Sequence, residues 1–287
     1  MRSQETNNDG CATRHTYQLE TIHKVPEFLQ CPHIYKGYRV FLSPAINAKS
    51  FFLWHNESLN VWTHAFAFFI YVWLAVQFNY DVWTGSHQLS AHMSSSDIWI
   101  YNLYIVSGMS SWWFSCLYHL FNNTSKCIHD RLFCIDTINI AFAIFGSYLP
   151  GIVFGFACYP FYQILYTSVV SLLVLTYVFL IQTNRMLLSI VAFSIIPTIH
   201  YSWIHSTIFP TIPISTVLIP FMQHATLSAI GFLMYTFKIP ERFYPGTFDY
   251  IAHSHQWWHI AVALGSWMWM CGLHKFLECK HYALCPP

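Results

Sequence analysis

The sequence has little charge. Only 9% of its 287 residues are Asp, Glu, Lys or Arg, against about 25% in a typical soluble domain. The formal net charge of +1 is too small to favour a nucleic-acid partner. The first 60 residues are polar and lack the basic start and apolar core of a cleavable signal peptide. These absences exclude an ordinary soluble domain and leave the first apolar span to direct membrane insertion.

Apolar residues take the place of charge. They make up 55% of the chain, and aromatic residues make up 19%. Seven stretches are long enough to cross a bilayer, which takes roughly 17–25 residues, and Trp and Tyr gather near many of their ends, as interfacial anchors do. The expected spans are 61–80, 98–121, 133–156, 160–181, 187–208, 214–237 and 251–273. The sequence therefore predicts an all-α membrane protein, a seven-transmembrane helix bundle.

The chain shows no internal repeat, low-complexity tract or linker. We therefore predict one transmembrane domain over 61–273, preceded by a polar segment over 1–60 and followed by a short tail over 274–287. Within the first segment, residues 37–58 could form an amphipathic helix at the membrane surface. Its aromatic cluster at 51–54 could equally be a simple membrane anchor.

Lysine and arginine alternate from one connection to the next. Six precede the first expected span, none lies in 81–97, two lie between the second and third spans, and the alternation continues as far as Lys238 and Arg242. The positive-inside rule then places the amino terminus in the cytosol and the carboxyl terminus outside the cell or in a lumen. Lys275 and Lys280 are the exceptions.

The nine cysteines include no C-x-x-C pair, so the usual thiolate zinc motifs are absent. With the expected orientation, Cys158, Cys279 and Cys285 lie on the outer or lumenal side, where a disulfide is allowed. The sequence does not choose among the pairings.

Five polar residues lie at comparable depths in three of the expected spans. Ser115 and His119 are four residues apart, as are His255 and His259, so each pair shares one face of a helix. Asp136 lies near the start of the third span. The expected orientation brings His119, Asp136, His255 and His259 to the cytosolic half of the bundle. Ionisable groups within a membrane are costly and indicate function.

This set fits zinc chemistry. His119, His255 and His259 would supply three imidazoles and leave a further coordination position open. Asp136 would be either a fourth ligand or the base that holds and deprotonates a water activated by zinc. Ser115 would either support the site from behind or only pack between helices. Any one of these histidines alone could be an interfacial or packing residue, but the set together predicts a metal.

Three other polar residues, Glu57, Asn60 and His64, share one face of the helix that enters the first span. They could form a cytosolic cap under the metal site, a surface for a partner, or a simple interfacial polar face. His200 and His224 lie inside later spans and are expected to be packing residues.

Several segments together resemble the progestin and adipoQ receptor family, which is related to the haemolysin III proteins. They are 32–39, 56–64, 115–119, Asp136, 240–249 and 254–259. The resemblance implies zinc on His119, His255 and His259 with Asp136 beside it. It also implies a membrane receptor or regulator, with ceramide-type amide hydrolysis as its chemistry and sphingolipid as its partner.

Within the family, the stretch 196–203 is similar to a Golgi-resident branch that traps Raf kinase, and the chain also resembles the adiponectin-receptor branch. The alternative that follows is a Golgi scaffold whose zinc is structural and whose amino-terminal segment binds a Raf-like kinase. The resemblance places the protein in the Golgi or the plasma membrane.

Overall fold

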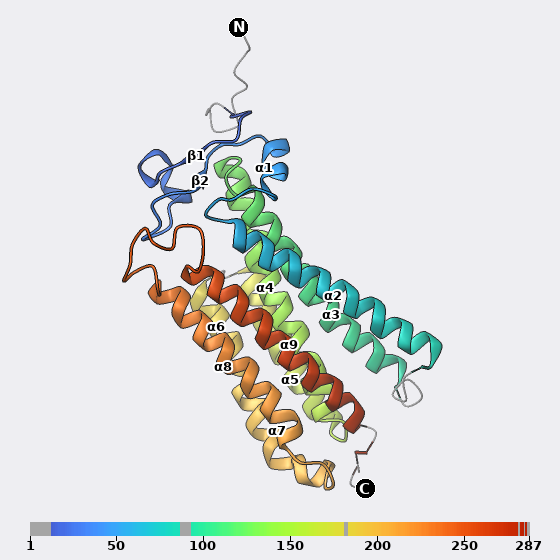
Figure 1. Ribbon diagram of the computed structural model, residues 1–287. Helices are drawn as coiled ribbons and strands as arrows, with labels where there is room; N and C mark the ends of the chain where they lie inside the picture. Colours follow the sequence, from blue (N-terminus) through green and yellow to red (C-terminus); the bar gives the residue numbers. More distant parts are fainter. Residues whose placement is uncertain (1–12, 87–92, 181–182, 281, 284, 286–287) are drawn as a thin grey trace. The chain divides into compact units, whose positions relative to one another are not determined.

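The computed structural model describes residues 13–86, 93–180, 183–280, 282–283 and 285 (Figure 1). Long helices make up most of this part of the chain, and two short strands, β1 (Leu19–Glu20) and β2 (Tyr38–Arg39), pair antiparallel before the first of them. The helices are the 3₁₀ turns η1 (Ile22–Lys24) and η2 (Glu27–Leu29), then α1 (Pro44–Ser50), α2 (Ser58–Thr84), α3 (Ser95–Phe121), α4 (Lys126–Gly155), α5 (Pro160–Phe179), α6 (Asn184–Phe193), α7 (Ile195–Ile208), α8 (Ser215–Phe237) and α9 (Ser254–Lys280).

The expected spans correspond to these helices with two differences. Among the described residues, six helical stretches are long and apolar enough to cross a membrane, and α3 is not one of them. Its 27 residues include serines and a histidine along their length, which lower its mean hydropathy. The helical, multi-pass character of the chain is thus confirmed, while the count of seven spans stays a prediction.

The second difference is a break in the expected span 187–208. The chain there forms α6 and α7, which meet at Ser194. Pro197 lies in the first turn of α7, and proline cannot donate the backbone hydrogen bond that would continue the preceding helix. The expectation of one interfacial helix over residues 37–58 is wrong. In this segment β2 comes first, and the helix α1 covers only Pro44–Ser50.

The chain divides into two compact units, each built from segments far apart in sequence. Unit 1 comprises residues 1–68, 112–137 and 226–265, and unit 2 comprises 69–111, 138–225 and 266–287. In unit 1 the strands and α1 lie beside the end of α3 (Figure 1). Val61, Cys116 and Leu120 form a buried cluster there that joins α2 to α3.

Unit 2 is held by apolar and aromatic contacts and by one disulfide. Gly108 on α3 lies so close to Tyr71 on α2 that a Cβ would come within 2.4 Å of the ring. Cys158 and Cys285 are bonded to each other, a pairing that the sequence left open; the side chain of Cys279 lies outside the described part.

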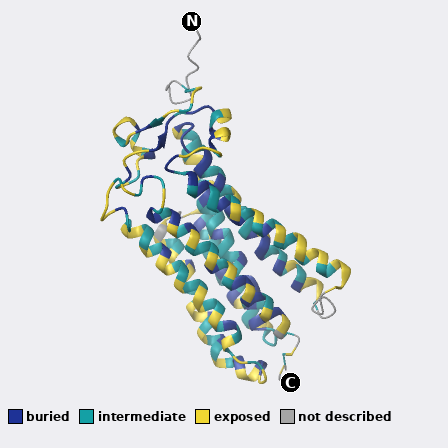
Figure 2. Cartoon of the chain, in the orientation of Figure 1, coloured by how far each residue is buried: buried dark blue, intermediate teal, exposed yellow. Residues whose placement is uncertain are grey.

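Large apolar side chains also cover the outside of the helices. Trp203 and Trp83 are each 83% exposed, and exposed positions run along the outer faces of the helices (Figure 2). A water-soluble protein rarely exposes so much contiguous apolar surface, whereas a lipid bilayer accommodates it.

Candidate metal centre

Four histidines from three helices of unit 1 form a compact group, which we call the histidine cluster. They are His64 on α2, His119 on α3, and His255 and His259 on α9. Nitrogen atoms of His64, His119 and His259 all lie within 4.8 Å of one another, and all three residues are buried. The ring of His255 lies 4.5 Å from that of His259 and 4.9 Å from that of His119, measured between centroids.

Two of the cluster's histidines are oriented by oxygen atoms behind them. Glu57 Oε2 accepts a hydrogen bond from His119 Nδ1 at 2.8 Å, and Asn60 donates to the same oxygen at 2.6 Å. A carboxylate only accepts, so His119 carries its proton on Nδ1 and keeps the Nε2 lone pair free. Thr63 lies 3.3 Å from His259 Nδ1 and donates its own proton to the Leu59 carbonyl, so His259 Nε2 is also left free.

His64 is held by Ser115 in the same manner. The Ser115 hydroxyl lies 3.0 Å from His64 Nε2 and also bonds the Asp136 carboxylate. Since a carboxylate only accepts, the serine donates to Asp136 and accepts from His64. His64 Nδ1 and Asp136 Oδ1 then remain buried without a hydrogen-bond partner. Orphaned polar atoms are rare in protein interiors, and here the two stand at the edge of a group of imidazoles.

The backbone that carries His119 is also fixed. Arg39 of β2 donates to the carbonyl of His119 at 2.6 Å, to that of Leu120 at 2.8 Å and to Ser50 Oγ at 2.8 Å. It thereby satisfies carbonyls at the end of α3, which have no partner within the helix. Burial lowers the pKa of Arg39 to about 10, so the guanidinium stays charged at neutral pH.

Glu241 fixes the start of α9, as Arg39 fixes the end of α3. Its carboxylate accepts hydrogen bonds from the backbone N–H of Ser254 at 2.7 Å and from the Ser254 hydroxyl. A carboxylate at the first turn satisfies free N–H groups and interacts favourably with the helix dipole. The turn that presents His255 and the turn that presents His259 follow directly from this anchored start.

The structure places all five residues expected at the site, Ser115, His119, Asp136, His255 and His259, in unit 1. His119 and His259 belong to the tight group of three nitrogens, whereas the third member of that group is His64 and not His255. Their individual roles stay predictions. His200 and His224 belong to unit 2, where His200 bonds the Tyr166 hydroxyl at 2.7 Å.

Sequence reasoning did not place His64 among the metal-binding candidates. The spacing of Glu57, Asn60 and His64 showed a polar helix face, but that signal did not distinguish a cap or partner surface from a set of site residues. Arg39 gave no signal, because its partners are backbone carbonyls.

The donor set fits a metal ion. Nitrogen atoms of three imidazoles lie within 4.8 Å of one another. In each ring one nitrogen contacts a neighbouring oxygen atom, and the other nitrogen is left to bind a metal. Imidazole nitrogens supported in this way are ligands that zinc prefers. Sulfur is not part of this group, in agreement with the absence of C-x-x-C pairs.

Comparison with known proteins extends this picture. A model of haemolysin-III related proteins matches residues 52–270, about three quarters of the chain. The chain belongs to the haemolysin III-related family, which includes the progestin and adipoQ receptors. The match begins in the segment that supplies Glu57 and ends after the histidines of α9, so the histidine cluster lies within it.

Curated relatives from distant organisms align over most of the chain. Progestin and adipoQ receptor family member 3 of Homo sapiens is 29% identical, covering 94% of this chain and 89% of the relative. Heptahelical transmembrane protein 3 of Arabidopsis thaliana is 27% identical, covering 90% and 87%. The adiponectin receptor protein of Drosophila melanogaster is 26% identical, covering 88% of this chain and 58% of the relative.

Proposed function

We propose that this multi-pass membrane protein of the progestin and adipoQ receptor family holds zinc in the histidine cluster and hydrolyses a lipid amide there. The observation that carries the proposal is the buried set of three imidazole nitrogens within 4.8 Å of one another beside a carboxylate with a free oxygen, Asp136 Oδ1. Zinc, when bound, supplies a Lewis acid that polarises a carbonyl and lowers the pKa of water to about 7.

Asp136 is the proposed base. Ser115 donates to its carboxylate, which fixes the group and leaves Oδ1 as the acceptor for a proton from the attacking water. The same oxygen then returns that proton to the leaving nitrogen of the amide, as general acid–base catalysis requires. Ser115 does not titrate in this scheme; it orients Asp136 and His64 together.

A small polar cavity lies beside the residues that support the histidine cluster. Unit 1 contains a cavity of about 60 Å³, lined by polar residues that include Arg39, Glu57 and His129. This volume is sufficient for one or two water molecules. Glu57 lines the cavity and also contacts His119, so the cavity reaches the residues that hold the cluster.

The substrate proposed is a ceramide-type amide. The family resemblance suggests this class, and the apolar outer surface of the helices suits a substrate that arrives from the bilayer. The test compares zinc content and ceramide turnover of the purified protein with those of Asp136→Asn. We expect the variant to keep its zinc and to lose turnover by about 10²-fold or more.

Asp130→Asn is the matched control, because Asp130 lies on the same helix but is exposed and pairs with Lys126. It should keep both zinc and turnover. Equal turnover in the wild type and Asp136→Asn would contradict the assignment of the base.

The fourth imidazole, that of His255, favours a second function. Four histidines can close a zinc site completely, as in structural sites. The protein would then be a receptor or scaffold whose amino-terminal segment binds a signalling partner. Full zinc content with no hydrolysis of any ceramide by the wild type would favour this function.

The proposed orientation keeps the amino terminus in the cytosol. The Cys158–Cys285 disulfide supports it, because disulfides persist outside the cytosol and both cysteines fall on the expected outer side. Glycosylation sequons begin at Asn56, Asn122 and Asn123, on the expected cytosolic side, and should stay unmodified. Mass spectrometry that finds a glycan on Asn122 of the native protein would reverse the orientation.

A further inference from the structure

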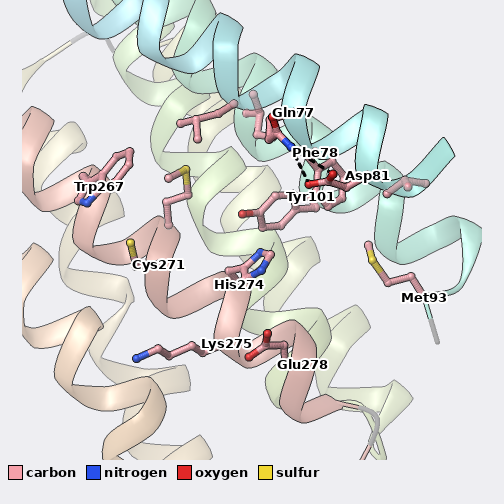
Figure 3. Close-up of a pocket in the computed structure, with 14 residues that line it drawn as sticks. Gln77, Phe78, Asp81, Met93, Tyr101, Trp267, Cys271, His274, Lys275 and Glu278 are labelled. Atoms are coloured by element: carbon pink, nitrogen blue, oxygen red, sulfur yellow. Dashed lines mark hydrogen bonds between the residues drawn. The ribbon is translucent and has the colours of Figure 1, made fainter. Parts of the chain in front are cut away.

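Unit 2 contains a cavity of about 420 Å³ between α2, α3 and α9 (Figure 3). Its volume lies in the range of sites that hold small ligands, about 300–1,000 Å³. Most of the lining is apolar and includes Leu74, Ile105, Trp267 and Met270. Such a lining favours a hydrocarbon chain.

One tyrosine hydroxyl opens onto this cavity. Tyr101 is only 4% exposed, and its hydroxyl points into the cavity (Figure 3). The neighbouring Tyr104 donates to the Ser266 carbonyl at 3.1 Å, whereas the Tyr101 hydroxyl makes no hydrogen bond within the described part of the chain. The hydroxyl is therefore open to an occupant of the cavity, and an occupant with a polar group would supply its hydrogen-bond partner.

The charge around the cavity is negative. Asp81 and Glu278 both line it, and neither forms an ion pair with a described residue, in contrast to Asp97, which pairs with Lys280. Asp81 instead accepts hydrogen bonds from Gln77 at 3.1 Å. Lys275 also lines the cavity, but its ammonium points away from Tyr101 and Asp81 (Figure 3). Two carboxylates therefore line the cavity without an ion-pair partner in the described part of the chain, against one lysine.

We propose that this cavity binds a single-chain amphiphile that carries a protonated amine. Its hydrocarbon chain lies among Leu74, Trp267 and Met270, and its ammonium donates to the Tyr101 hydroxyl in the negative field of Asp81 and Glu278. A long-chain alcohol lacks the charge, and a fatty acid carries the wrong one. The site is independent of the proposed zinc chemistry, because every lining residue belongs to unit 2.

Cys271 reports on occupancy. It is a free, exposed cysteine that lines the cavity, so an occupant should shield it from alkylation by N-ethylmaleimide. The full chain in a neutral maltoside detergent is treated at pH 7 with hexadecylamine, hexadecanol or palmitate, and alkylation is followed by mass spectrometry. We expect hexadecylamine to slow alkylation of Cys271 about tenfold more than the other two. Cys127, a free cysteine of unit 1, should react at the same rate in all three.

Two variants test the carboxylates and the tyrosine hydroxyl separately. The double variant Asp81→Asn, Glu278→Gln should lose the preference for the amine, while Glu27→Gln, which changes an exposed acid of unit 1, should keep it. Tyr101→Phe, which removes only the hydroxyl, should weaken protection and retain the elution profile of the folded protein.

Equal protection by the three compounds, or none by hexadecylamine, would overturn the proposal. So would a double variant that is folded by its elution profile and retains the preference for the amine. If the double variant does not fold, unchanged protection in Tyr101→Phe would overturn it instead.

Discussion

The two units bury different kinds of side chain. Unit 1 buries a connected set of polar groups, in which Glu57, Ser115 and Arg39 each hold a histidine or the backbone beside one. Unit 2 buries mainly apolar and aromatic residues, such as Phe154 and Phe276, and is closed by a disulfide. Buried polar networks are costly unless fully satisfied, and this one surrounds the candidate metal centre. With the proposed zinc in the histidine cluster, changes in unit 1 should act first on zinc content, and changes in unit 2 should act on stability alone.

The largest effect expected is on zinc content. His119 and His259 are common to the ligand set implied by the family and to the tightest group in the structure, so the double variant His119→Ala, His259→Ala should lose nearly all bound zinc. His200→Ala in unit 2 should keep it. Elemental analysis of the purified proteins measures both. Equal zinc in the double variant and the wild type would show that the cluster is not the metal site.

Breaking the disulfide should produce the reverse pattern. Cys158→Ser releases a link across 127 residues, and loss of a native disulfide typically costs about 2–5 kcal/mol. Thermal unfolding in detergent should show a lower midpoint, while zinc content stays unchanged. If Cys158→Ser lost zinc as well as thermal stability, unit 2 would also determine zinc binding, which contradicts the comparison of the two units.

Arg39→Met tests whether the support behind the cluster matters. It leaves the carbonyls of His119 and Leu120 without their donor, which costs about 1–3 kcal/mol, and should lower zinc affinity about 10-fold or more, as loss of supporting contacts does. Lys36→Met, an exposed change nearby, is the control. Competition with a zinc chelator measures the affinity, and equal values for the two variants would contradict the role of Arg39.

The smallest effect expected is on the pH dependence of the free energy of unfolding, through His55 of unit 1. Burial lowers the pKa of His55 to about 2, and the neutral ring accepts from the Glu57 backbone N–H at Nδ1. The unfolded chain takes up that proton near pH 6.5, so this stability is present above pH 6.5 and is lost as the pH falls toward 2. At pH 5.5 the loss is about 1 kcal/mol.

His55→Gln should remove that part of the pH dependence. Unfolding midpoints at pH 7.5 and 5.5 compare it with the wild type. If the midpoint of the variant falls by as much as that of the wild type, His55 is not the titrating group.

The sequence was sufficient to predict most of the long helices and the helix faces that carry Ser115, His119, His255 and His259. Apolar runs predicted α2, α5 and α8 within a few residues, and the four-residue spacings predicted which face of α3 and α9 carries the site. Proline at 197 was visible, but a membrane helix can also continue through proline, so the break at Ser194 needed the structure.

Other features depend on contacts that no pattern encodes. His64 joins the cluster because α2 lies beside α3, and Arg39 acts on carbonyls rather than on side chains. The partner of Cys158 and the unpaired hydroxyl of Tyr101 likewise follow only from the arrangement of the chain in space.

X-ray absorption at the zinc edge tests the central claim most directly. The purified, zinc-loaded protein should show imidazole nitrogen ligands at about 2.0–2.1 Å and no sulfur. Unit 1 also contains Cys116, Cys127 and Cys134, so a thiolate site is a real competitor. Sulfur scattering at about 2.3 Å, or no zinc retained by the purified protein, would contradict a metal centre built from the histidine cluster.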